Sequence, residues 1–288
     1  MAPLLDVDNW PELDDPIFVA VLSGWVDAGA AGSGGLAVID GQLTARREFA
    51  KIDLADLMDL QQTRPSVHLA GGLTREITWP SIEFVAGHLG HDVVLCHGPE
   101  PSLRWRAILG EIAEAASRLG VTRAFTLGGI PSMASHRRAI QVMSTASSPD
   151  LLDVPTAWRS DYTGPTGAQT VLQVLLGEVG IPTMSLWAQV PHYVSAGPSP
   201  PSMRAVLAKL RELSGLTIDL GELDDQAAAY VRRVEESIAE RPDVVAAIDA
   251  IESDTSDTTT FAQALDEGEL PSGDELASEI EKFLRGQG

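Results

Sequence analysis

One segment near the start of the chain places a strand, a glycine turn and a helix in direct succession. Residues Phe18 to Leu22 form an unbroken apolar run, as expected of a strand buried on both faces. The run breaks at Ser23-Gly24-Trp25, and the small residues Ala28 to Gly35 lead into a helical pattern. Strand, turn and helix form the first half of a βαβ unit. In an open α/β sheet such turns meet at the carboxyl edge, where sites are built, so we expect functional residues there.

The same alternation recurs along the chain and predicts an α/β fold with a mostly parallel central sheet flanked by helices. Strands are expected at 17–22, 92–97, 123–128 and 183–190, and near 45–52, 66–71 and 139–145, while 79–86 is ambiguous. Helices are expected at 29–43, 102–119, 167–179, 202–214, 223–240 and 274–285. Ser102 is the expected N-cap of the second of these helices.

The composition changes near Asp219, after which only helical patterns occur. We therefore expect an α/β domain over residues 1–218 and an acidic helical appendage over 219–288. The appendage docks either on its own α/β body or on another subunit. Carboxylates are dense from Glu252 to Glu281, and no basic residue interrupts them. They form either a solvated surface or a docking surface for a basic partner.

Charge and composition exclude several classes of protein. The formal net charge of -21 argues against binding to nucleic acid or to an anionic membrane surface. No apolar run approaches the roughly 20 residues that span a bilayer, and residues 1–15 lack the pattern of a signal peptide. The single cysteine, Cys96, rules out a disulfide within the chain. These features favour the cytoplasm.

The first glycine turn offers two candidate residues. The glycines of this turn, among them Gly29, Gly32 and Gly34, could hold an anion on backbone N–H groups, or could simply allow close packing of the helix on the sheet. Asp27 could bind a ligand, act as a base, or accept hydrogen bonds from the start of the helix. Glu100 follows the strand at 92–97, so it is expected at the same edge as Asp27.

Later turns add the remaining candidates. His136, Arg137 and Arg138 form the densest basic cluster, which could clamp a carboxylate or phosphate, or pair with acidic side chains across a subunit boundary. Thr166 is the expected N-cap of the helix at 167–179. Including the residues that flank these turns, the candidates for ligand or partner binding are Asp27, Gly29, Glu100, Arg104, Ser132, His136, Arg137, Arg138, Thr166, His192 and Tyr193.

Spacing supports no catalytic constellation. The chain has no His-Glu-x-x-His pattern, no paired cysteines and no Gly-x-Ser-x-Gly elbow. The turn at Gly29 lacks the Gly-Lys-Ser/Thr ending of a P-loop and the spacing of a dinucleotide fingerprint. We therefore expect no metal site, no cofactor and no assignable catalytic residue.

Four motifs together resemble the PAC2 family, named for a proteasome assembly chaperone, in its actinobacterial-type branch. They occur in the family's order and cover roughly residues 15–240. The four are Gly24-Trp25-Val26-Asp27-Ala28-Gly29, Gly128-Gly129-Ile130-Pro131-Ser132-Met133-Ala134, Gly164-Pro165-Thr166-Gly167 and Leu186-Trp187-Ala188-Gln189-Val190-Pro191-His192-Tyr193.

The resemblance implies an α/β fold similar to the nucleoside phosphorylase/hydrolase type, self-association, and a chaperone-like role toward proteasome subunits. The sequence ends Arg285-Gly-Gln-Gly288, without the hydrophobic-tyrosine-any tripeptide with which many proteasome-binding proteins end. That departure argues against ring binding by this route. The alternative hypothesis is a small-molecule-binding enzyme, ligase- or hydrolase-like, with Asp27, Glu100 and the arginine loop around a polar ligand.

Overall fold

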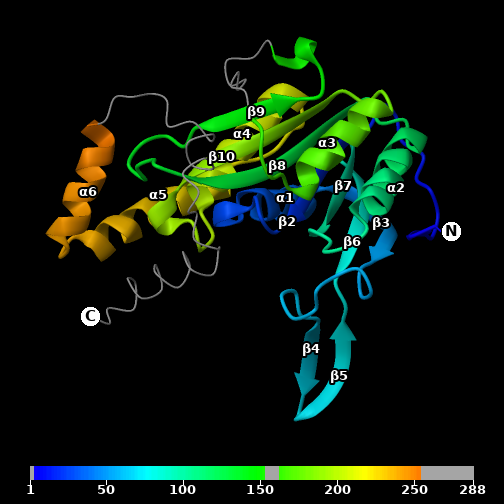
Figure 1. Ribbon diagram of the computed structural model, residues 1–288, viewed down its shortest axis with the longest axis horizontal. Coiled ribbons are helices and arrows are strands. Elements are labelled where there is room, and N and C mark those ends of the chain that lie inside the picture. The colour runs from blue at the N-terminus through cyan, green and yellow to red at the C-terminus, as the bar shows by residue number, and fades with distance from the viewer. Residues whose placement is uncertain (1–2, 153–161, 254–288) are drawn as a thin grey trace.

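The computed structural model describes residues 3–152 and 162–253 (Figure 1). The helix expected at 274–285 and nearly all of the acidic span up to Glu281 lie outside these residues. One eight-stranded sheet, in the order β1-β3-β6-β7-β2-β8-β10-β9, forms the centre of the molecule.

The middle of the sheet is parallel. Each of its four strands pairs in parallel with the next. They are β7 (Asp92–Pro99), β2 (Ile17–Ser23), β8 (Arg123–Ser132) and β10 (Thr183–Pro191). Their carboxyl ends therefore lie along a single edge, as expected from the glycine turns.

Antiparallel strands extend this centre on both sides. They are β6 (Ser81–His88), β3 (Thr44–Asp53) and β1 (Leu5–Val7) beyond β7, and β9 (Val142–Ala146) beyond β10. The ambiguous segment at 79–86 is thus a strand, and β1 is one that the sequence patterns did not predict. The expected α/β fold is confirmed, with parallel pairing confined to the four central strands.

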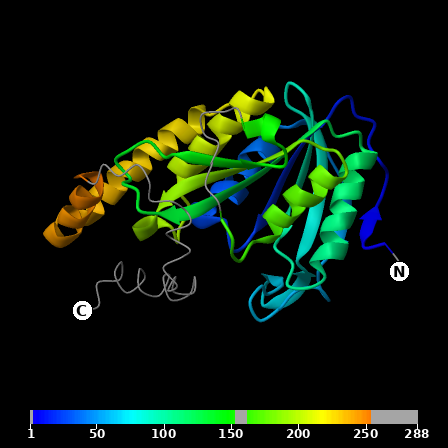
Figure 2. The same cartoon turned by 45° about the horizontal axis from the view of Figure 1, so that its top comes forward.

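Helices cover both faces of the sheet (Figure 2). Phe18, Ala20 and Leu22 of β2 point to one face, and Val19 and Val21 point to the other. This explains why the strand is apolar throughout. The first face is covered by α2 (Trp105–Arg118) and α3 (Ala168–Glu178), and the second by α1 (Ala31–Gln42) and α4 (Pro200–Ser214).

Two further helices extend from α4 at the end of the described chain (Figure 1). They are α5 (Gly221–Ile238) and α6 (Pro242–Ser253), so Pro242 begins a new helix. A small apolar cluster of Ile238, Val244 and Ile248, with Tyr193 and Val245 beside it, joins α6 to α5 and to the α/β body. None of the described helices is long and apolar enough to cross a membrane.

A two-stranded hairpin projects from the sheet (Figure 1). It consists of β4 (Ser66–Ala70) and β5 (Leu73–Thr78), which pair only with each other. We call residues 66–79 the β-arm. The strand expected at 66–71 is confirmed as β4, whereas β5 was not expected.

Candidate functional site

The carboxyl edge of the four parallel strands brings most of the candidate residues together. Adjacent strands β7, β2 and β8 lead to Glu100, to Asp27 and to the loop of His136, respectively. The fourth strand, β10, leads to His192 and Tyr193. The contacts at this edge show what each side chain does in the fold.

Asp27 lies four residues before α1 and accepts hydrogen bonds from the first turn of that helix. Its Oδ1 accepts hydrogen bonds from the N–H groups of Gly32 (2.8 Å) and Ser33 (3.2 Å). Burial raises the pKa of the Asp27 carboxyl, while the bonds from Ser33 and Gly32 act in the opposite direction. The contacts are those of a structural cap.

We expect Asp27→Ala to lower the free energy of unfolding by about 1 kcal/mol, because two helix N–H groups lose their acceptor. Asp27→Asn keeps an oxygen acceptor and removes a charge that burial disfavours, so it should change stability by less than about 0.5 kcal/mol at pH 7. Urea unfolding of both variants measures the difference. If both lose stability equally, the charge itself stabilises the turn.

The glycine turn at Gly29 does not present free amides to an anion. The N–H of Gly29 donates to Ser195 O (2.8 Å), and the N–H of Ala30 donates to Asp27 O (2.9 Å). Gly29 O in turn accepts the N–H of Ser199 (2.8 Å). With Gly32 and Ser33 bonded to Asp27, the turn serves helix packing and ties the β2–α1 loop to the β10–α4 loop.

Glu100 lies at the start of a different helix from Asp27. Burial raises the pKa of its carboxyl, and a hydrogen bond from the N–H of Ala168, in the first turn of α3, opposes that change. Its Oε2 is buried and has no hydrogen-bond partner. Because α1 and α3 cover opposite faces of the sheet, the two carboxyl groups are built into separate helix starts. The described structure contains no hydrogen bond between them.

Two expected N-caps were wrong. Helix α2 starts after Arg104, which has a left-handed backbone (φ 59°), and the Oγ of Ser102 instead accepts the N–H of Asp59 (2.8 Å). Helix α3 starts after Gly167, with no side-chain cap, and Thr166 is exposed. Arg104 thus contributes an unusual backbone conformation to this edge.

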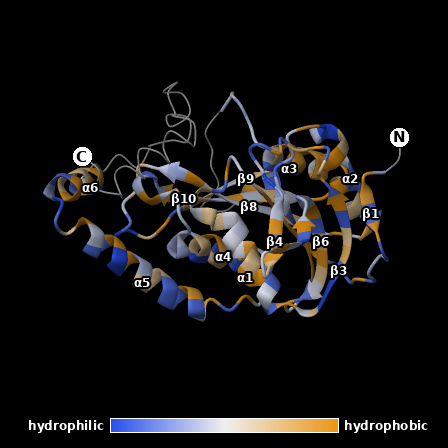
Figure 3. Ribbon diagram, turned by 90° about the horizontal axis from the view of Figure 1, so that it is seen from below, coloured by the Kyte–Doolittle hydropathy of each residue, from blue (hydrophilic) through white to orange (hydrophobic). Residues whose placement is uncertain are grey.

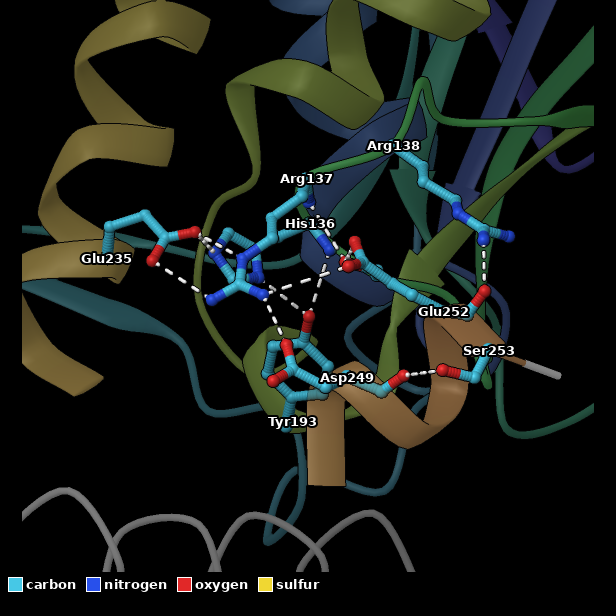
Figure 4. A network of polar contacts seen from close by, with 9 residues as sticks. His136, Arg137, Arg138, Tyr193, Glu235, Asp249, Glu252 and Ser253 are labelled. Carbon is cyan, nitrogen blue, oxygen red and sulfur yellow. Dashed lines mark hydrogen bonds and ion pairs between the residues drawn. The ribbon is translucent and has the colours of Figure 1, made fainter. Parts of the chain in front are cut away.

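The basic loop after β8 holds the C-terminal helices (Figure 4). Arg137 forms ion pairs with three carboxylates. Glu235 of α5 lies at 2.5 Å. Two residues of α6, Asp249 and Glu252, lie at 2.8 Å and 3.7 Å. Arg138 donates to the backbone oxygen of Glu252. The acidic partners therefore belong to this same chain, an arrangement that neither sequence hypothesis for these arginines included.

His136 is the buried residue of this contact, and the partly buried Tyr193 lies against it (Figure 4). The Tyr193 hydroxyl lies 2.8 Å from His136 Nδ1 and accepts the backbone N–H of His136 at 2.9 Å. His136 Nε2 lies 3.2 Å from Glu235 Oε1, without the alignment of a hydrogen bond. We call His136, Arg137, Arg138 and Tyr193, with Glu235, Asp249 and Glu252, the helix-docking cluster.

The folded chain should lose stability in mild acid because of His136. Burial lowers the pKa of His136, although Glu235 opposes this, so the unfolded chain takes up a proton at a higher pH than the folded chain does. The stability contributed by neutral His136 is therefore present above the ordinary pKa of 6.5 and is lost as the pH falls through that value toward the lower folded pKa.

The measurement is a comparison of unfolding free energy against pH for the wild type and His136→Gln. His192 also has a pKa lowered by burial, and both proteins retain it, so subtraction removes its contribution. We expect the wild type to lose more stability than the variant between about pH 7 and pH 5. Parallel curves would contradict the role given to His136.

The remaining candidates at this edge are Ser132 and His192. The backbone of Ser132, at the end of β8, hydrogen bonds to His192 and raises its pKa, against the larger effect of burial. Nδ1 of His192 is buried without a partner. Within residues 3–152 and 162–253, no three His, Cys, Asp or Glu side chains form a group that could hold a metal ion.

A cleft of about 410 Å³ lies beside α1, near the base of the β-arm. Sequence patterns gave no sign of it, because its walls come from five separate elements. Its polar lining includes Asp40 of α1, Glu83 of β6 and His97 of β7, and Trp79 forms part of the wall. Glu83 accepts a hydrogen bond from Ser81 Oγ (3.0 Å) and lies 3.8 Å from His97 Nε2.

Comparison with known proteins identifies relatives across most of the chain. The model of the PAC2 family matches residues 21–238. A PAC2 family protein from Streptomyces avermitilis is 38% identical, with 77% of this chain and 95% of that one covered, and a TM-score of 0.72. A proteasome-assembly chaperone homologue from Mycobacterium tuberculosis is 32% identical, with 78% and 96% covered and a TM-score of 0.73.

A more distant structure shares the fold alone. An archaeal proteasome activator from Pyrococcus furiosus is 20% identical, with 81% of this chain and 97% of that one covered, and a TM-score of 0.63. No curated protein matches the chain.

Proposed function

Since this chain belongs to the PAC2 family, we propose that it is a non-enzymatic assembly chaperone or interaction protein related to proteasome assembly factors. In this proposal residues 1–218 form the folded body, and the acidic appendage over 219–288 contributes contact surface. The protein associates with itself and binds proteasome subunits in the cytoplasm.

The observation that carries the proposal is that apolar side chains, and not free polar ones, are exposed at the carboxyl edge of the sheet. Asp27 and Arg137 are committed to contacts within the fold. Large apolar side chains are instead exposed there. Trp25, Leu103 and Met133 lie on the loops that follow β2, β7 and β8, three adjacent strands. Exposed apolar groups at one edge are typical of a protein contact surface.

The test is binding to proteasome subunits of the same cell. Purified α and β subunits are incubated with the chain, and complexes and the rate of ring assembly are followed by native mass spectrometry. We expect the chain to bind unassembled subunits and to be absent from the finished particle.

A matched pair of variants locates the surface. Trp25→Asp with Leu103→Asp should weaken subunit binding by at least tenfold, about 1.4 kcal/mol. Val174→Asp, which changes an equally exposed apolar residue on α3, should leave it unchanged. Absence of binding to every proteasome subunit would contradict the proposal.

A second candidate function is a small-molecule-binding enzyme, and Glu100 is the observation that favours it. Its Oε2 is buried without a partner, and the nearby Gln169 side-chain amide, fully buried in the first turn of α3, also has none. A polar ligand could supply the missing hydrogen bonds. A thermal-shift screen of metabolites, repeated with Glu100→Gln, tests this; a turnover that depends on Glu100 would favour the enzyme over the chaperone.

A further inference from the structure

The cleft beside α1 is formed by regular elements on two sides. One wall is a single stripe of the helix, whose residues are spaced as neighbours on one helix face. They are Ser33, Leu36, Ala37 and Asp40. The floor is made of alternate residues from three adjacent strands, which point to the α1 side of the sheet. They are Val21 and Ser23 of β2, His97 and Pro99 of β7, and Ser81 and Glu83 of β6. Figure 3 views the molecule from the side on which α1 lies in front of the sheet. A helix and a sheet thus fix the shape of the cleft.

The cleft has the size and the mixed lining of a site for a small ligand. Its volume of about 410 Å³ lies within the roughly 300–1,000 Å³ of such pockets. Leu36 and Ala37 give one wall an apolar surface, and Trp79 lines the cleft where the β-arm joins β6. Trp79 is 48% exposed, so its ring is available to a ligand. A cation over the face of an indole ring is attracted by the electrons of that ring.

One carboxylate oxygen of Glu83 has no hydrogen bond within the described chain. Its Oε1 accepts the Ser81 hydroxyl at 3.0 Å. Its Oε2 lies 3.8 Å from His97 Nε2, which is too far for a hydrogen bond. The Glu83 side chain is 37% exposed, so a ligand in the cleft can reach it. An amine or guanidinium group would supply the missing donor in a charge-assisted hydrogen bond.

The charges around the cleft disfavour an anion. Asp40 contributes a second carboxylate and is paired with Arg46, which does not line the cleft (Oδ1 to Nε 2.8 Å). Lys51 is opposite Glu83 on β3, but it forms no ion pair within the described residues. No lysine or arginine is among the described residues that line the cleft. With a net charge of -21 on the chain, the field at the cleft attracts a cation and repels an anion.

We propose that this cleft binds an organic cation, a guanidinium or amine group on a short apolar stem. The charged group lies between Glu83 and the ring of Trp79, and the stem lies along Leu36 and Ala37. The inference goes beyond the proposed function, whose exposed apolar residues at the carboxyl edge do not line the cleft. A free metabolite and an arginine side chain of another protein both carry this chemistry.

Two ligands that differ only in charge test the class of ligand. Saturation-transfer NMR on the full chain, at low ionic strength, measures the dissociation constants of N-butylguanidinium and of the neutral N-butylurea. We expect the cation to bind at least about tenfold more tightly. Equal affinities, or no saturable binding of the cation at millimolar concentration, would overturn the proposal.

The same measurement separates the two sources of the cation. Its probe is the capped tripeptide acetyl-Ala-Arg-Ala-amide, which carries the arginine side chain on a peptide backbone. Tighter binding of the tripeptide than of N-butylguanidinium assigns the ligand to a protein segment. The opposite order assigns it to a free metabolite. Both results agree with a cation in the cleft.

Variants of the lining test whether the cation binds in this cleft. Glu83→Gln and Trp79→Ala should each weaken the binding of N-butylguanidinium by at least about fivefold. Trp79→Phe retains an aromatic face and should remain within about threefold of the wild type. The matched control for the charge is Glu76→Gln, which removes an exposed carboxylate on β5 outside the cleft and should have no effect. Circular dichroism confirms that each variant is folded. Binding that neither Glu83→Gln nor Trp79→Ala weakens would overturn this site and leave the separately tested binding of proteasome subunits unaffected.

Discussion

Gly129→Ala is expected to destabilise the folded chain by about 3 kcal/mol or more, because the added methyl group has no space. A Cβ at this position would lie 2.3 Å from the backbone oxygen of Ala28 and 3.0 Å from the Cβ of Ala31. The strand cannot move away, since Gly129 is paired with Ala188 of β10 and its N–H donates to Val26 O (3.0 Å). The β2–α1 turn can cross β8 this closely because Gly129 and its neighbour Gly128, where a Cβ would lie 2.5 Å from Val26 O, have no side chain.

The control for this variant is Gly110→Ala. Gly110 lies inside α2, and a Cβ there would meet no atom within 4 Å. Alanine is the better helix former, so we expect a gain of about 0.5–1 kcal/mol. Urea denaturation followed by circular dichroism measures both. A loss of less than about 1 kcal/mol for Gly129→Ala would show that the turn can shift, contrary to the packing described.

Arg137→Glu is expected to weaken the docking of α6 on the body by about 2 kcal/mol of free energy. This figure combines the loss of several partly exposed ion pairs with the repulsion that replaces them. The change removes the cation shared by Glu235, Asp249 and Glu252 and adds a fourth carboxylate among them. The apolar cluster around Ile248 and the hydrogen bonds that Arg138 and Ser135 donate to Glu252 would then hold α6. Hydrogen exchange of residues 242–253 should accelerate, while exchange in β2 and β8 should not.

The matched control is Arg204→Glu, which reverses the charge of an arginine that pairs with a single carboxylate, Asp224 of α5. We expect Arg204→Glu to lower the free energy of unfolding by less than about 1 kcal/mol and to leave amide hydrogen exchange in α6 unchanged. High salt should reduce the effect of Arg137→Glu, because the cluster is partly exposed. Unchanged exchange in residues 242–253 of the Arg137 variant would show that apolar contacts, not the arginine, dock the helix.

The central strands were predictable because burial on both faces leaves a signal in the sequence. Phe18, Ala20 and Leu22 pack on one face and Val19 and Val21 on the other, so the run is apolar at every position. Parallel pairing then places the following turns at one edge, as the sequence predicted. Four ordered motifs indicate the PAC2 family, and the match of the family model over residues 21–238 confirms it.

Other features depend on information that local sequence does not carry. Ser102 has the right residue type for a cap, but the helix begins only after the left-handed backbone of Arg104. Arg137 meets Glu235 and Asp249 from helices about a hundred positions later, a pairing decided by tertiary structure. Strand β5 is exposed at every residue, so it lacks the alternation between buried and exposed positions by which strands are found.

The position of β2 has a consequence for synthesis on the ribosome. This strand is among the first parts of the chain to be made, yet it lies between β7 and β8, which end at Pro99 and Ser132. At about 5–20 residues per second, β2 waits several seconds for the first strand that pairs with it. The nascent chain therefore carries an unpaired apolar segment before the central sheet can form. During that interval it depends on the chaperones that bind nascent polypeptides.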